Sequence, residues 1–267
     1  MILASATSLS MPLAIVAALA YLVPALGSSQ LSSTVARGAF LLAWLLHALV
    51  LAFGLLAGEP RFGFGPALSV TAWLVAAVYM IESRVFPQLQ TRWALCALGA
   101  AAVLLALFFP GSALHPTASP WLPLHWALGI ASYGLFGAAV AHAWFMTRTE
   151  DRIRLAADSH SGMPLLTIER LMFRFVAGGF ILLSASLLVA ILFGDSLYGS
   201  QAGWKWNHKT IFSVLSWLTF AVLLIGRSQW GWRGRRAVSV LYIGSGLLLL
   251  AYVGSRFVLE VVLGRAK

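Results

Sequence analysis

The sequence contains a single cysteine, and this scarcity excludes two classes of redox protein. Cys96 is the only cysteine, and it lies within an apolar run. One thiol can form neither an internal disulfide nor the CxxC pair of a redox motif, and no CxxCH site for covalent haem attachment is present. The chain is therefore neither a thiol-disulfide exchanger nor itself a c-type cytochrome.

Charged residues are also scarce. Only 10% of the 267 residues are charged, whereas 60% are hydrophobic, and the mean hydropathy is +0.88. A water-soluble domain cannot place that much apolar surface in its interior, so the main solvent of the chain must be lipid. We therefore expect an integral membrane protein.

The basic residues that are present do not indicate nucleic-acid binding. The formal net charge is +10, but the lysines and arginines flank apolar runs instead of gathering on one face. This distribution is typical of residues that set membrane topology. The expected partner is the lipid bilayer, not nucleic acid.

Motifs of several enzyme and transporter classes are missing too. The sequence has no Walker motif for nucleotide phosphates and no HExxH metalloprotease motif. Only eight carboxylates occur, and few lie in apolar runs, which disfavours a carboxylate proton relay. The longest polar stretch, about residues 148–170, is too short for a separate domain. Residues 1–267 thus predict a single transmembrane domain, with its chemistry in the membrane or at the outer face.

Eight apolar segments predict an all-α polytopic fold, because backbone polar groups in lipid must be satisfied within each segment. Lysine and arginine are absent before Arg37, so we expect the first segment to be a retained helix and the N-terminus to lie outside. With eight spans, the C-terminus is then also outside. The predicted inner side carries 12 Lys and Arg residues and the outer side 6. The segments cover about residues 8–26, 36–57, 66–82, 93–109, 121–147, 171–194, 208–226 and 237–262.

Two histidines lie inside these apolar runs, His47 in the second and His125 in the fifth. Polar side chains at such depth are costly and commonly serve a function. Neutral imidazole binds iron well, and haem iron takes one or two axial imidazoles. The structural alternative is a pair of histidines that form hydrogen bonds between helices. Both interpretations stay open at this stage.

A second set of candidates lies near the predicted outer face: His115 in a loop, His208 at the start of the seventh segment, and the neighbouring Trp204, Trp206 and Lys209. The two tryptophans could anchor a helix at headgroup depth or form a flat surface for a planar ligand. The lysine could pair with ligand carboxylates.

Arg256 lies within the last apolar segment, with Glu260 four residues later. The two side chains could form an ion pair at the membrane interface. Alternatively, the guanidinium could hold an anionic group such as a haem propionate in bidentate fashion.

The last third of the sequence resembles the cytochrome c assembly family of haem-handling membrane proteins. That family carries an outer motif of the form WGxxWxWDxKE before a helix that ends in a GWRGRR-like turn. Here the stretch is GSQAGWKWNHKTIFSVLSWLTFAVLLIGRSQWGWRGRRA. Trp206 matches the last tryptophan of the motif and Lys209 the lysine, whereas Asn207 replaces the aspartate. LHWALGIASYGLFGAAVAHAWFMTR resembles the family's histidine-initiated helix.

The resemblance is clear over residues 122–262, and the family core would span about residues 36–262. It is greatest to the compact YpjD-like inner-membrane branch, which implies a multi-pass protein of the bacterial inner membrane. It also implies non-covalent binding of haem b, with His47 and His125 on the iron, and presentation or transport of haem towards apocytochrome c or other maturation proteins. His115 and His208 would be candidate ligands at the outer face, and Trp204, Trp206, Lys209 and Arg256 would line the outer opening.

The sequence departs from the family motif in ways that bear on function. The first tryptophans and the aspartate are missing, and the outer loops are short. Haem handling is therefore expected in preference to the ligase reaction that attaches haem, so the chain is not expected to be an enzyme. The alternative is a non-enzymatic scaffold or regulatory subunit of the same fold that binds no haem.

Overall fold

The computed structural model describes residues 2–27, 30–56, 61–85, 92–113, 119, 121–154, 165–194 and 207–263. Nearly all of them are helical, apart from two short strands, β1 (Arg61–Phe62) and β2 (Ser112–Ala113), which pair in antiparallel register. The helices are α1 (Ile2–Leu26), α2 (Ser33–Leu56), α3 (Phe64–Val85), α4 (Arg92–Phe108), α5 (Trp121–Arg154), α6 (Leu165–Leu192), α8 (His208–Trp230), α9 (Gly234–Leu249) and α10 (Ser255–Phe257). Two π-helical turns, η1 (Leu250–Gly254) and η2 (Val258–Val262), flank α10.

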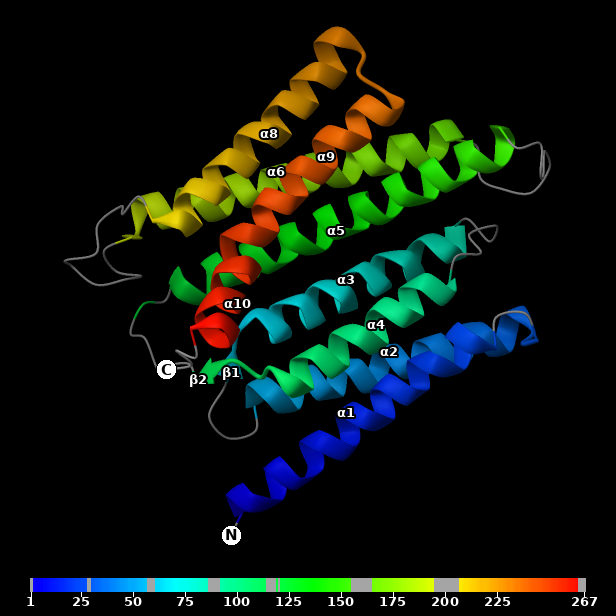
Figure 1. Cartoon of the computed structure of the whole chain (residues 1–267), viewed down its shortest axis with the longest axis vertical. Helices are drawn as coiled ribbons and strands as arrows, with labels where there is room; N and C mark the ends of the chain where they lie inside the picture. The colour runs from blue at the N-terminus through cyan, green and yellow to red at the C-terminus, as the bar shows by residue number, and fades with distance from the viewer. Residues whose placement is uncertain are drawn as a thin grey trace. The chain divides into compact units, whose positions relative to one another are not determined.

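The chain forms two compact units: residues 1–115 with 256–267, and residues 116–255. In the first unit, α1 packs on α2 and α4, and α3 packs on α4 (Figure 1). Small residues allow this close packing. Gly99 of α4 lies against the ring of Tyr21, where a Cβ would come within 2.8 Å of the ring carbons. Cys96, one turn earlier, is fully buried in the same contact region.

In the second unit, α5 and α6 pack along much of their length, and α8 pairs with α9 (Figure 1). An aromatic pair fills the interior: the rings of Phe136 and Phe220 stack at 3.8 Å between centroids. Glycines stand opposite both rings, Gly179 beside Phe136 and Gly244 beside Phe220, where a Cβ would lie at 3.0 Å and 2.8 Å from ring carbons. The absence of a side chain at these positions lets the helices approach.

Two hydroxyl groups inside the second unit donate hydrogen bonds to a neighbouring helix. The Ser216 hydroxyl donates to the carbonyl of Gly244 at 2.8 Å, and the Tyr133 hydroxyl donates to the carbonyl of Leu248. Leu248 lies just before the π-helical turn η1. These bonds connect α8 and α5 to α9, as expected where no water is present to satisfy buried polar groups.

The predicted all-α polytopic membrane fold is confirmed, and every predicted apolar segment coincides with a helix. By length and composition, six helices of the described chain could cross a membrane: α2, α3, α5, α6, α8, and α9 continued through α10. The apolar parts of α1 and α4 are shorter, at Ser10–Leu26 and Ala94–Phe108. The count of eight spans, the outer location of both termini, and the single-domain organisation with a family core at residues 36–262 stay predictions.

Candidate functional site

His47 is fully buried in α2 and has a hydrogen-bond partner at each ring nitrogen. Nε2 lies 2.7 Å from the Ser69 hydroxyl of α3, and Nδ1 lies 3.2 Å from the Tyr21 hydroxyl of α1. The Tyr21 ring also meets the imidazole edge-on. A neutral imidazole has one donor and one acceptor nitrogen, so two hydroxyl groups satisfy it completely. In this arrangement His47 connects three helices of the first unit.

The position of Ser69 opposite His47 is fixed by a tryptophan pair one turn away. The indoles of Trp44 and Trp73 stack at 4.6 Å between centroids. Each indole N–H donates to the other residue's backbone carbonyl, at 3.1 and 3.2 Å. This reciprocal contact sets the register of α2 against α3.

Replacing Ser69 with alanine is expected to lower the free energy of unfolding by about 2 kcal/mol, because it leaves a buried imidazole nitrogen unsatisfied. Denaturation of the purified protein by SDS titration measures the change. Ser83→Ala is the control on the same helix, since that hydroxyl donates only to the nearby carbonyl of Met80. Equal stability of the two variants would contradict the structural role of the His47 contacts.

His125 of α5 has a different environment. Its Nδ1 lies 3.1 Å from the backbone carbonyl oxygen of Ser186 on α6 and 3.2 Å from the Ser186 hydroxyl. A carbonyl oxygen only accepts, so Nδ1 carries the proton and the neutral ring has its lone pair on Nε2. Among the described residues, none forms a hydrogen bond with Nε2. An imidazole held by its other N–H on a backbone carbonyl is typical of metal-ligating histidines.

An aromatic pair lies one turn from His125, at the end of the α5–α6 contact. Trp121 of α5 stacks on Phe193 at 4.0 Å between ring centroids, with an interplanar angle of 11°. Trp121 is 38% exposed. The half-buried imidazole is thus next to a flat apolar surface that a planar ligand could contact.

Of the predicted outer-face residues, the structure describes His208, Lys209 and Arg256. His208 is exposed at the first position of α8, and the Lys209 ammonium lies 6.0 Å from the centroid of the Tyr252 ring. Arg256 belongs to the first unit, where its Nη1 donates to the Ser112 hydroxyl at 3.2 Å. His115, Trp204, Trp206 and the side chain of Glu260 lie outside the described residues.

Asn207, which replaces the aspartate of the family motif, caps the N-terminus of α8. Its side-chain oxygen accepts a hydrogen bond from the backbone N–H of Thr210 at 3.0 Å and from the Thr210 hydroxyl at 3.2 Å. Asparagine and aspartate are about equally good at this position. The replacement of aspartate by asparagine therefore preserves the N-cap of α8 and removes one negative charge.

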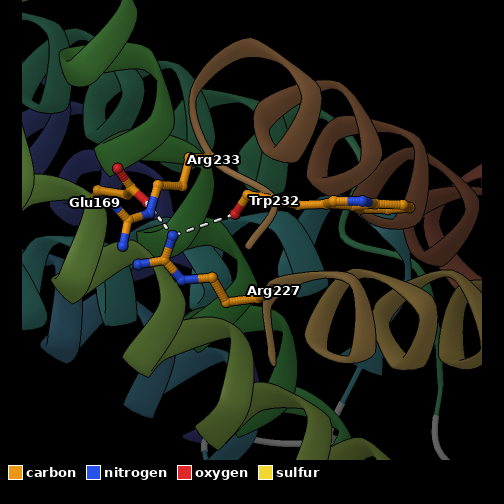
Figure 2. A network of polar contacts seen from close by, with 4 residues as sticks. All are labelled: Glu169, Arg227, Trp232 and Arg233. Carbon is orange, nitrogen blue, oxygen red and sulfur yellow. Dashed lines mark hydrogen bonds and ion pairs between the residues drawn. The ribbon is translucent and has the colours of Figure 1, made fainter. Parts of the chain in front are cut away.

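A polar network that the sequence did not predict lies where α8 turns into α9 (Figure 2). Glu169 of α6 is only 7% exposed and pairs with Arg227 of α8 at 2.6 Å. Arg227 also donates to the backbone carbonyl of Trp232 at 3.2 Å, and its guanidinium lies 4.6 Å from the ring centroid of Phe173. Arg233 approaches the same carboxylate at 3.9 Å. The network joins the GWRGRR turn to α6.

The structure leaves the ligand pair His47 and His125 as a prediction. His47 belongs to the first unit and His125 to the second. The described residues contain no group of three His, Cys, Asp or Glu side chains that could hold a metal ion, but an axial haem ligand needs only one or two imidazoles. Tyr21, Ser69 and Ser186 went unnoticed in the sequence because a hydroxyl residue within an apolar run carries no signal of its own.

Residues 7–263 match the family described as Cytochrome C assembly protein. A relative, the inner membrane protein YpjD of Escherichia coli (strain K12), is 30% identical over 161 residues, which are 59% of this chain and 60% of YpjD. The match therefore spans less than two thirds of that relative. The cytochrome c biogenesis protein CcsA of Thermosynechococcus vestitus is 22% identical over 80% of this chain and 72% of its own length. A CcsA of Synechococcus sp. (strain CC9605) is 24% identical over 70% and 71%. No solved structure matches this chain.

Proposed function

Because this chain belongs to the cytochrome c assembly protein family, we propose that it is a haem-handling protein of c-type cytochrome biogenesis. It binds haem b non-covalently in the bacterial inner membrane and presents or transports it towards the outer face. Haem is the cargo, and the partners that receive it are apocytochrome c or other maturation proteins. Relatives named for cytochrome c biogenesis and for the inner membrane support this proposal.

The observation that carries the proposal is the environment of His125. Its Nδ1–H is held by the Ser186 carbonyl, and Nε2 keeps its lone pair. This is the tautomer and orientation that an axial ligand requires. His125 would therefore ligate the haem iron through Nε2, and the Trp121–Phe193 pair would offer a flat contact for the macrocycle.

The remaining candidates would act around that ligand. His47 fits less well, because iron ligation through Nε2 would require it to give up the short contact with Ser69; as second ligand it stays a prediction. Lys209, in the same unit as His125, carries a cationic group that would pair with a haem propionate, and Arg256 of the first unit stays a predicted partner of the propionates. His115 and His208 would be candidate ligands at the outer face, and Trp204 and Trp206 would line the outer opening.

The contacts of His47 favour a second candidate function, a scaffold or regulatory subunit of the same fold that binds no haem. Both nitrogens of this imidazole are satisfied by hydroxyl groups of the protein itself. A fold stabilised in that way needs no metal at this position.

Deletion of the gene separates the two functions. If the chain handles haem, we expect deletion to lower the amount of holocytochrome c, and the wild-type gene but not His125→Ala to restore it. His142→Gln is the control, because His142 lies on the same helix and its Nδ1 bonds to the carbonyl oxygen of Ala138, one turn earlier in that helix. Unchanged holocytochrome c, with altered abundance of another membrane complex, would favour the scaffold.

A further inference from the structure

A groove of about 380 Å³ lies between α5 and α9, within the second unit and away from His125. Its lining combines two arginines with aromatic and hydroxyl side chains. The lining residues are Trp144, Thr147, Arg148, Asp151, Arg235, Val238, Ser239 and Tyr242. Neither the haem proposal nor the family motif uses these residues as ligands.

The charges of the groove favour an anion. Arg148 and Arg235 face it from the two helices, and both are exposed. The one carboxylate, Asp151, lies 3.6 Å from Arg235, and the two side chains are 53% and 64% exposed. An exposed pair at that distance contributes little, so Arg235 remains able to bind another anion. Arg148 adds a second positive charge.

The two arginines are held on rigid parts of the fold. The Arg148 guanidinium lies 4.8 Å from the ring centroid of Trp144, on the same helix. Arg235 follows the turn that is fixed by Glu169 and Arg227 (Figure 2). The Arg148 side chain therefore loses less rotamer freedom on binding, and the fixed turn sets where the Arg235 side chain starts, which favours a defined site over a diffuse charge.

The turn before Arg235 is shaped by its glycines and tryptophan. Gly231 adopts a φ of +62° and ends α8 in the left-handed conformation. The Trp232 ring packs against Gly226, where a Cβ would lie 2.4 Å from it, and the Arg236 guanidinium stacks on that ring at 4.1 Å. Within the described chain, Arg233 provides no side-chain cap for the first N–H groups of α9. The positive end of the helix dipole therefore adds to the charge near Arg235.

The groove lies at the ends of two helices that could span a membrane. Its residues occupy the end of the apolar span Trp121–Asp151 and the beginning of the span Gly234–Phe257. Below the arginines its walls are apolar, formed by Trp144, Val238 and the ring of Tyr242. Tyr242 and the following Ile243 are exposed on α9, where acyl chains surround a spanning helix. The groove thus has positive charge at one end and apolar walls beyond it. A phospholipid, which carries acyl chains on its phosphate, fits both parts, whereas a free phosphate ion would contact only the charged end.

We propose that the groove between α5 and α9 binds the phosphate headgroup of an anionic phospholipid. Arg148 and Arg235 bind the phosphate, and the hydroxyl groups of Ser239 and Tyr242 are placed to donate to the rest of the headgroup. Basic pockets between spanning helices are typical sites for such lipids. This inference does not depend on haem binding.

Native mass spectrometry of the detergent-purified full-length protein tests the proposal, with phosphatidylglycerol and phosphatidylcholine of equal chain length as probes. We expect the wild type to retain phosphatidylglycerol preferentially. Arg148→Gln and Arg235→Gln should each weaken that binding about fivefold, since a basic residue near a membrane surface contributes about 1 kcal/mol. Asp151→Asn should strengthen it, because the competing carboxylate is removed.

Arg174→Gln is the matched control, because Arg174 is an exposed arginine of α6 that does not line the groove. It should leave phosphatidylglycerol binding unchanged. An equal loss in this control, or an unchanged preference in the Arg148→Gln, Arg235→Gln double variant, would overturn the proposal. So would displacement of the lipid by millimolar inorganic phosphate, which would identify the site as one for free phosphate.

Discussion

When haem is added to the His125→Ala variant and unbound haem is removed, we expect almost no Soret band to remain with the protein. In the wild type, the Ser186 carbonyl holds the Nδ1 proton and leaves the lone pair on Nε2, the atom that would bind iron under the proposed function. Removing the imidazole removes the ligand, while the Trp121–Phe193 surface beside it stays in place. The measurement is the Soret absorbance per mole of purified protein after haem titration, and we expect at least a tenfold decrease.

Two controls separate loss of the ligand from loss of the fold. In His125→Gly, added imidazole should restore part of the band, because the small molecule can occupy the space of the missing side chain. His142→Gln should keep the band, since that buried histidine packs against Phe145 and Phe175 and its Nδ1 bonds to the Ala138 carbonyl oxygen of its own helix. A His125→Ala variant that binds haem as the wild type does would show that Nε2 is not the ligand.

Arg227→Gln should be among the most destabilising single substitutions in the second unit, with a loss of about 3 kcal/mol in the free energy of unfolding. The change removes the partner of Glu169, whose side chain is only 9% exposed, and also the bond to the Trp232 carbonyl. Removing one member of a buried ion pair leaves an uncompensated charge, which costs more than the pair contributes. Unfolding in detergent by SDS titration gives the value.

Arg233→Gln is the matched control for that substitution. Arg233 approaches the same carboxylate, but at 3.9 Å and with 64% of its side chain exposed, so its loss should cost less than about 1 kcal/mol. If both variants lose a similar free energy of unfolding, the network stabilises the protein only through the positive charge near Glu169, and the buried contact with Arg227 has no special role. The difference between the free energies of unfolding of the two variants measures how much the buried contact stabilises the turn.

The helices of this protein could be predicted because lipid makes the pattern unambiguous. Each apolar segment had to be helical, and the start of the seventh, at residue 208, agrees with α8. Two helices extend further than the apolar segments predict: α5 continues beyond residue 147 to Arg154, and α6 begins before residue 171, at Leu165. Charged residues there continue the helices beyond the apolar runs, so hydropathy alone could not find those ends.

The partners of the two histidines could not be predicted from the sequence. Their position in apolar runs identified them as candidates, but their contacts depend on which faces of the helices meet. Ser69 and Ser186 are single hydroxyl residues in segments that are apolar on most sides. Only the packing of α2 on α3 and of α5 on α6 shows that one imidazole is fully satisfied and the other keeps a lone pair.

The GWRGRR turn shows a second limit of sequence reasoning. From the sequence, its arginines indicate only which side of the membrane the turn lies on, and the turn itself serves only to identify the family motif. In the structure, Arg233 lies near Glu169, Arg235 lines the groove, and Arg236 stacks on Trp232. These separate roles depend on the left-handed turn at Gly231 and on the distant Glu169, which is 58 residues from Arg227 in the chain.

The absorption spectrum of the detergent-purified protein, recorded as isolated, after haem titration and after dithionite reduction, tests haem handling most directly. If the chain handles haem, we expect a Soret band that saturates as haem is added, and separate sharp α and β bands after reduction if two imidazoles bind the iron. A spectrum that stays featureless after haem titration would contradict it. In that case the chain would be a scaffold of the same fold, with His47 and His125 as packing residues.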